Sequence, residues 1–159
     1  MHRERIDQTR GDGYNAFCLG ALIVRHGWLL MLRRTASDSW AGRWEPPGGG
    51  VEAGEALAEA LAREVQEEAG LAIASALYIG HLDYPARENP LLPASRGFFF
   101  AAEEPPGHWP VRINQTEHDR FAWSTADRVR STRPDLRALV IRRLALTARS
   151  GAGPPGDPA

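Results

Sequence analysis

The sequence predicts an α/β fold, an α/β/α sandwich built on a mixed β-sheet, and three observations lead to this expectation. Short apolar, β-rich runs recur along the chain, two helical segments alternate with them, and Gly- and Pro-rich loops lie between. A sheet with helices on both faces buries the apolar side of each element. At 159 residues, with 43% hydrophobic and 25% charged residues, the chain fits one globular domain.

Five segments are predicted as strands. Phe17–Val24 and Trp28–Arg33 are apolar and β-rich, and residues 25–27 between them suit a hairpin turn. A long polar loop, rich in Gly and Pro, is expected over residues 35–54. The remaining strands are expected at Leu77–Leu82, Gly97–Ala101 and Arg120–Trp123.

Helices are predicted in the middle and at the end of the chain. Glu55–Ala69 consists of strong helix formers, and Gly70 is a typical helix end. Asp135–Thr147 has the pattern of an amphipathic helix that starts after Pro134. The short segment Thr125–Arg130 is also expected to be helical.

The two ends of the chain differ in composition from the middle. Residues 1–13 are polar and are expected to form a flexible arm, and residues 150–159 are expected to form a disordered tail, which leaves 14–149 as the domain. No apolar signal-peptide segment and no stretch of transmembrane length is present in the sequence. We therefore expect a cytoplasmic protein.

Charge and cysteine content limit the possible partners. The net charge is −1 and no segment is polybasic, so we expect no nucleic-acid and no membrane partner. All 19 residues of the Lys and Arg class are arginines. Any anion has to be held by arginine, histidine, backbone N–H groups or a metal. The single Cys18 excludes an internal disulfide, and its apolar surroundings favour a buried structural thiol over a nucleophile.

One stripe of the predicted helix Glu55–Ala69 is apolar in its first half and acidic in its second. At about 100° per residue, Leu57, Leu61, Glu64 and Glu68 fall within roughly 60° of one another. Carboxylates that continue a core-facing stripe need compensation, which a hard divalent cation such as Mg²⁺ provides through oxygen ligands. From the helix alone, an ordinary solvated acidic face is an equally good interpretation.

The loop before this helix favours the metal site. The three glycines 48–50 let main-chain groups approach a ligand without a Cβ atom in the way. Pro46-Pro47 stiffen the loop directly upstream, which a merely flexible connection does not need. A stiff glycine-rich loop that leads into an acidic helix predicts a site for a metal and a phosphate.

From residue 49 onward the sequence resembles the Nudix box of the Nudix hydrolase family. The match comprises Gly49, five residues, Glu55, seven residues, Arg63-Glu64 and then VQEEAGL, ending at Leu71. The similarity extends to the MutT-like branch of the family through Leu29–Arg34, Trp44, Pro47-Gly48-Gly49 and the spacing of Glu117 from Trp123. The resemblance implies the Nudix fold over most of the domain.

The resemblance also implies roles for the matched residues. Metal ligands would be the carboxylates of Glu64, Glu67 and Glu68 with the carbonyl of Gly48, and Glu64 would also act as the general base. Arg63 would orient these carboxylates, and Glu55 would brace the junction of loop and helix. Substrate phosphates would contact Gly49 and Arg34, whereas Arg33 is the weaker candidate. Glu117 would be a further ligand or the base, with Glu104 and Asp119 as alternatives.

The implied reaction is hydrolysis of a pyrophosphate linkage in a nucleotide by metal-activated water, with Mg²⁺ as cofactor and Mn²⁺ as a possible substitute. A nucleoside triphosphate, ADP-ribose or a related nucleotide is the expected substrate, and Tyr84-Pro85 is a weak pointer to ADP-ribose. A homodimer is compatible with the resemblance. The competing function is a nucleotide sensor without turnover, although such proteins commonly lose box carboxylates. An isomerase of the same superfamily needs a catalytic Cys, and Cys18 lies in the first apolar strand.

Overall fold

The computed structural model describes residues 13–14, 16–38, 40–85, 94–126, 129, 134–147 and 154–156. The predicted arm at 1–13 and the predicted tail at 150–159 lie almost wholly outside these residues, so the domain limits stay predictions. Among the described helices, none has both the length and the apolarity that a membrane crossing requires.

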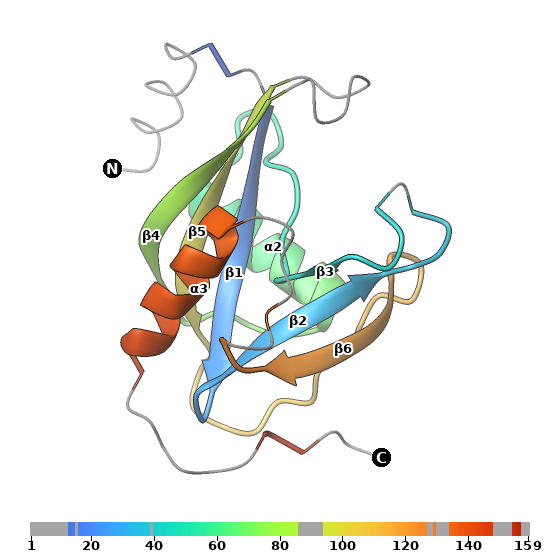
Figure 1. The fold of residues 1–159 in the computed structure, drawn as a ribbon, viewed down its shortest axis with the longest axis vertical. Helices are drawn as coiled ribbons and strands as arrows, with labels where there is room; N and C mark the ends of the chain where they lie inside the picture. The colour runs from blue at the N-terminus through green and yellow to red at the C-terminus, as the bar shows by residue number, and fades with distance from the viewer. Residues whose placement is uncertain are drawn as a thin grey trace.

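A mixed sheet runs through the molecule, with one helix on each face (Figure 1). Its path is β3-β2-β1-β5-β4, and β6 pairs with β2 off this path. β1 and β5 are parallel, whereas the other pairings are antiparallel. The strands are β1 (Ala16–Arg25), β2 (Trp28–Arg34), β3 (Trp44–Glu45), β4 (Ser75–Tyr84), β5 (Ser95–Glu103) and β6 (His118–Ser124). The predicted α/β/α sandwich with a mixed sheet is confirmed.

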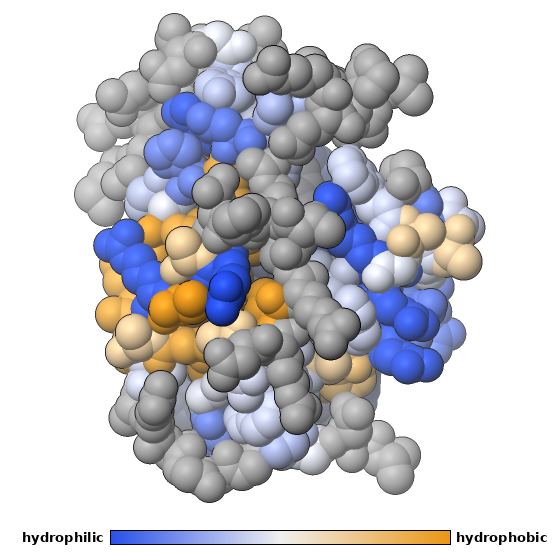
Figure 2. All heavy atoms as spheres, viewed as in Figure 1, coloured by the Kyte–Doolittle hydropathy of each residue, from blue (hydrophilic) through white to orange (hydrophobic). Residues whose placement is uncertain are grey.

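The two helices divide the core into two layers. Leu19, Ala21 and Ile23 of β1 pack with α2 (Leu57–Ala69), and Leu22 between them packs with α3 (Pro134–Ala145). This division follows from the alternation of side chains along a strand. In the space-filling view, apolar surface gathers around α3, where the side chain of Ile141 is exposed (Figure 2).

The structure differs from the sequence predictions at two places. β3, which lies inside the predicted loop 35–54, was not predicted, because two residues are too short to leave a periodic pattern. The helix predicted at Thr125–Arg130 is wrong for the described residues 125, 126 and 129, none of which is helical. The N–H of Val129 nevertheless donates to the carbonyl of Thr125 (3.1 Å), the bond of one helical turn.

Candidate metal and phosphate site

The glycine-rich loop lies between β1 and the last turn of α2. N–H groups of β1 donate to the carbonyls of Pro47 (2.8 Å) and Gly49 (2.9 Å), which fixes the loop against the sheet. On the other side, the N–H of Gly48 donates to Oε2 of Glu68 (2.7 Å). A Cβ atom at position 48 would lie 2.8 Å from Cα of Gly20, so the loop passes β1 at a distance that only glycine allows.

Gly49 makes room for the carboxylate of Glu64. A Cβ atom at position 49 would lie 2.6 Å from Cδ of Glu64, well inside van der Waals contact. The half-buried Glu64 side chain thus rests directly on the loop backbone. Gly49 is therefore required for packing against the acidic helix, whereas the close approach of the loop backbone to a ligand stays a prediction.

Arg63 connects the loop to three glutamates. Its guanidinium binds both carboxylate oxygens of Glu55 (2.9 Å each), Oε1 of Glu64 (2.8 Å), Oε2 of Glu67 (3.3 Å) and the carbonyl of Gly50 (3.0 Å). The hydrogen bonds from Arg63 are the main reason that the pKa of Glu55 is lowered to about 2. The arrangement is compatible with the orienting role of Arg63 and the bracing role of Glu55, which stay predictions.

A distant loop is attached to the end of α2 and brings Glu117 to the helix. The N–H groups of Arg112 and Asn114 donate to the last carbonyls of α2, those of Ala69 (2.8 Å) and Glu68 (3.1 Å). Asn114 then donates through Nδ2 to Oε1 of Glu117 (2.9 Å). Backbone groups that a helix end leaves unpaired are satisfied here by the loop, which fixes the position of Glu117.

Glu68 is a buried carboxyl group in acidic surroundings. Its side chain is 2% exposed, and burial raises its pKa to about 8, with Glu45 and Glu117 acting in the same direction. The N–H of Gly48 and the charge of Arg34 oppose this shift without cancelling it. Burial also raises the pKa of Glu64, against the effect of Arg63. Without a cation, this end of the helix is therefore short of positive charge.

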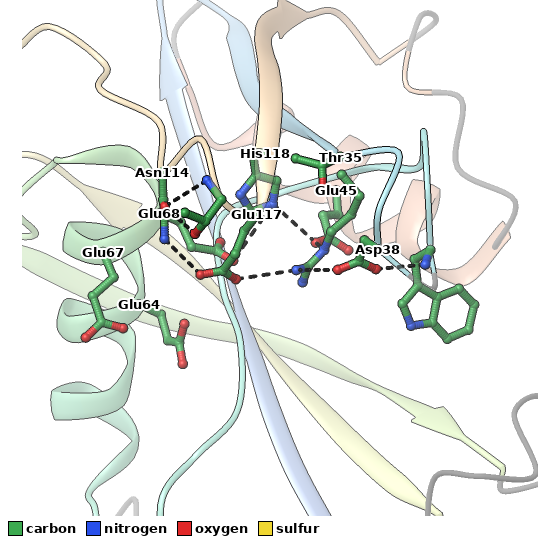
Figure 3. A network of polar contacts seen from close by, with 12 residues as sticks. Thr35, Asp38, Glu45, Glu64, Glu67, Glu68, Asn114, Glu117 and His118 are labelled. Atoms are coloured by element: carbon green, nitrogen blue, oxygen red, sulfur yellow. Dashed lines mark hydrogen bonds and ion pairs between the residues drawn. The ribbon is translucent and has the colours of Figure 1, made fainter.

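Arg34 lies among the carboxylates. It binds Glu45 through Nε, and its Nη1 lies 3.5 Å from Asp38 and 3.5 Å from Glu117. Figure 3 shows Asp38, Glu45 and Glu117 in one network of polar contacts, with Glu117 next to Glu68. The contact of Arg34 with a substrate phosphate stays a prediction, but its position beside Glu117 is compatible with that role.

His118 and Glu45 are two members of this group that the sequence did not indicate. Nε2 of His118 lies 3.6 Å from Glu45 and 3.8 Å from Glu68. The five histidines are scattered singly along the sequence, so their spacing gave no sign of a metal site. His118 reaches the site through strand pairing, because it lies opposite Arg34 in the register of β2 and β6. Only the predicted position of Glu117, its direct neighbour, pointed toward this stretch.

The structure brings together most of the predicted site residues and separates the alternatives. Asp119 is bound by Arg33 (2.7 and 2.9 Å), and Glu104 is bound by Arg25 (2.8 and 2.6 Å). Both are thus occupied by arginines elsewhere, which favours Glu117 among the three candidates. Residues gathered along the loop and the acidic face of α2 are Gly48, Gly49, Glu55, Arg63, Glu64, Glu67, Glu68 and Glu117, with Arg34 next to them.

The donor set fits a hard divalent cation. Four carboxylates, those of Glu64, Glu67, Glu68 and Glu117, supply oxygen atoms of the kind that Mg²⁺ prefers. Burial and the neighbouring carboxylates raise the pKa of Glu68, and a bound cation would oppose this shift. Whether each of these residues and the carbonyl of Gly48 is a ligand stays a prediction.

Known proteins resemble the chain over short segments. It is 47% identical over 60 residues to the protein named "Putative 8-oxo-dGTP diphosphatase 2" of Mycobacterium tuberculosis, which is 38% of this chain and 43% of that protein. It is 43% identical over 53 residues to CTP pyrophosphohydrolase of Escherichia coli, which is 33% of this chain and 39% of that protein. The chain thus spans about two fifths of the length of these relatives.

Solved structures resemble the whole fold. The MutT NUDIX hydrolase from Burkholderia pseudomallei has a TM-score of 0.67 and 25% identity over 80% of this chain and 96% of that one. The MutT protein from Methanosarcina mazei has a TM-score of 0.67 and 26% identity over 80% and 91%. In addition, the family model described as NUDIX domain matches residues 16–144. This chain is a member of the NUDIX domain family.

Proposed function

We propose that this protein is a Mg²⁺-dependent pyrophosphohydrolase that cuts a phosphoanhydride bond in a nucleotide. One observation carries the proposal: the glycine loop and the loop that holds Glu117 are both attached to the end of α2, where the buried carboxyl of Glu68 lies with Glu45 and Glu117 near one guanidinium, that of Arg34. A divalent cation with the phosphates of a nucleotide supplies the missing charge and occupies the oxygen ligands. Mn²⁺ has the same ligand preference and is expected to replace Mg²⁺.

Nucleoside triphosphates are the substrate class that we put first. The relatives named for 8-oxo-dGTP and for CTP are both named for nucleoside triphosphates, and each matches this chain at above 40% identity. These matches cover only 60 and 53 residues, so the choice of nucleotide is proposed separately from the pyrophosphohydrolase activity. Tyr84-Pro85, the weak pointer to ADP-ribose, keeps that compound in the test.

The chain's own residues divide the work in the following way. Glu64 accepts a proton from the attacking water, because it is the glutamate that lies on the loop and is oriented by Arg63. Backbone groups of the glycine loop and the guanidinium of Arg34 hold phosphate oxygens. A divalent cation held by these carboxylates would lower the pKa of a water molecule and neutralise phosphate charge. The products are a nucleoside monophosphate and pyrophosphate or a second phosphorylated fragment.

The test is a substrate panel in the presence of Mg²⁺ for wild type, Glu67→Gln and the matched control Glu52→Gln, which changes an exposed glutamate of the loop. The panel contains canonical and oxidised dNTPs, NTPs, ADP-ribose, nucleotide sugars and dinucleoside polyphosphates. We expect strong turnover of one class, lost in Glu67→Gln and kept in Glu52→Gln. Nucleotide binding without turnover of any compound would instead identify a sensor, and turnover within a few-fold of wild type in Glu67→Gln would reject the metal assignment.

A further inference from the structure

His118 is a completely buried side chain without a hydrogen-bond partner. Its exposure is 0%, and neither Nδ1 nor Nε2 has a partner within hydrogen-bond distance. A buried polar group that makes no hydrogen bond costs about 1–3 kcal/mol, and native proteins keep few of them. The imidazole therefore needs a partner that the protein atoms around it do not provide.

Two carboxylates face the same ring nitrogen. Oε1 of Glu45 lies 3.6 Å and Oε1 of Glu68 lies 3.8 Å from Nε2 of His118. One ligand atom of each of the three residues lies within 4.8 Å of the other two. These separations are too long for hydrogen bonds, but they leave space for an ion that bonds to all three at about 2.0–2.2 Å after a small contraction.

The charges around this point favour a cation. Among the described residues, Glu45, Glu68 and Glu117 face one arginine, Arg34, whose Nε donates to the same oxygen of Glu45, Oε1, that faces His118. Oε2 of Glu68 is taken by the N–H of Gly48, which leaves Oε1 for the space in front of His118. An ion there would share Glu68 with the acidic face of α2 but would lie on the opposite side, toward β3 and β6.

We propose that Glu45, Glu68 and His118 form a second cation site, which binds a first-row transition metal such as Co²⁺ or Zn²⁺ in preference to Mg²⁺. An imidazole nitrogen with two carboxylate oxygens is a mixed donor set that suits these metals, whereas Mg²⁺ keeps oxygen ligands. The site shares Glu68 with the proposed function, but its occupancy is measured without substrate. Failure of one proposal is therefore distinguishable from failure of the other.

The first experiment measures Co²⁺ binding to metal-free protein by visible absorption and by equilibrium dialysis. Wild type is compared with His118→Phe, with Glu67→Gln and with the control Asp119→Asn, whose carboxylate is bound by Arg33 outside the site. Because His118→Phe replaces an unpartnered polar ring by an apolar ring, we expect the metal-free variant to melt no lower than wild type. We expect one Co²⁺ ion to bind at least about tenfold more weakly in His118→Phe and unchanged in Asp119→Asn and Glu67→Gln.

The second measurement needs no variant to fold. In ¹⁵N-labelled wild type, Zn²⁺ titration should shift Nε2 of the buried His118 and leave the ring nitrogens of the exposed His26 and His81 unshifted. Equal Co²⁺ affinity in wild type and His118→Phe, or an unshifted Nε2 in the presence of excess Zn²⁺, would overturn the proposal. His118 would then be a structural residue of the core.

Discussion

The two ends of α2 carry glutamates in opposite electrostatic environments. Before the first turn, Glu55 receives two hydrogen bonds from Arg63, and its pKa is lowered to about 2. In the last turn, Glu68 is buried beside Glu45 and Glu117, and its pKa is raised to about 8. Both glutamates belong to the Nudix box, and the residue type alone does not show that their environments differ.

This difference distinguishes the pair of Arg63 and Glu55, a scaffold that holds the loop on the helix, from the surroundings of Glu68, where we propose that a cation binds. The pair of Arg63 and Glu55 is complete within the protein, because both oxygens of Glu55 have a guanidinium donor and Arg63 also binds the loop carbonyl of Gly50. Around Glu68, the carboxylates of Glu45 and Glu117 outnumber the one guanidinium in contact with them, that of Arg34, and we propose that a cation balances their charge. Substitutions in the first group should act on stability and geometry, and substitutions in the second should act on cation binding.

The largest effect on turnover is expected at Glu64, which is bound by Arg63 and lies on the acidic face of α2. Glu64→Gln removes the proposed base while the amide can still accept a hydrogen bond from Arg63. We expect kcat to fall by about a thousandfold, within the range for general bases, with little change in melting temperature. Steady-state kinetics and thermal unfolding measure both quantities, and Glu59→Gln on the exposed face of α2 is the control. A kcat within tenfold of wild type would exclude Glu64 as the base.

Gly49→Ala should have the next largest effect. The added Cβ atom overlaps the carboxylate of Glu64, and a displacement of about 1 Å in a reacting group costs on the order of a hundredfold in rate. We expect kcat to fall by roughly that factor. Gly50→Ala is the matched control, since a Cβ atom there meets nothing within 4 Å. Equal rates in the two variants would show that the close approach of loop and helix is not needed for turnover.

Neighbouring arginines allow a smaller and more specific comparison. Arg34→Gln removes the guanidinium that contacts Asp38, Glu45 and Glu117, whereas Arg33→Gln removes the partner of the exposed Asp119. For Arg34→Gln we expect kcat/KM to fall by about tenfold, mainly through KM, because the proposed phosphate contact and a local positive charge are both lost. Arg33→Gln should stay within about twofold, as exposed ion pairs contribute little. Unchanged KM and kcat in Arg34→Gln would reject the phosphate contact.

Stability of the metal-free protein should depend on pH with opposite signs for the two glutamates. Glu55 ionises at about 2 in the folded state, below its ordinary 4.5, so its stabilising effect is present above pH 4.5 and is lost as pH falls toward 2. Glu68 keeps its proton to about pH 8, so the free energy of unfolding decreases as pH rises from 4.5 to 8. Urea unfolding in EDTA at pH 5 and pH 8 should show this decrease in wild type and a smaller one in Glu68→Gln. An identical pH dependence in both proteins would contradict the buried, proton-holding carboxyl.

The sequence was sufficient for the elements whose pattern is local. The acidic stripe of α2 was predicted from helical periodicity, and Leu57, Leu61 and Glu68 are indeed buried on one face of the helix. The strands predicted around Phe17–Val24 and Gly97–Ala101 were likewise found, a few residues longer than expected. These predictions depend on side-chain spacing within one element, which the sequence displays directly.

What the sequence did not contain is the set of contacts that strand pairing creates. Glu45 and His118 are 73 positions apart, and they meet because β3 and β6 lie on either side of β2. Likewise, the attachment of Asn114 to the end of α2 depends on a backbone hydrogen bond and not on a side-chain pattern. Residues that complete a site from distant elements are visible only once the topology is known.

The most direct test of this account is the Mg²⁺ dependence of turnover in wild type, Glu68→Gln and Glu55→Gln, measured on the best substrate of the panel. The account predicts that Glu68→Gln needs at least about tenfold more Mg²⁺ for half-maximal activity or is inactive. Glu55→Gln should keep the wild-type Mg²⁺ requirement and melt at a lower temperature. A wild-type Mg²⁺ requirement in Glu68→Gln, with the requirement altered in Glu55→Gln, would contradict the division into scaffold and cation site.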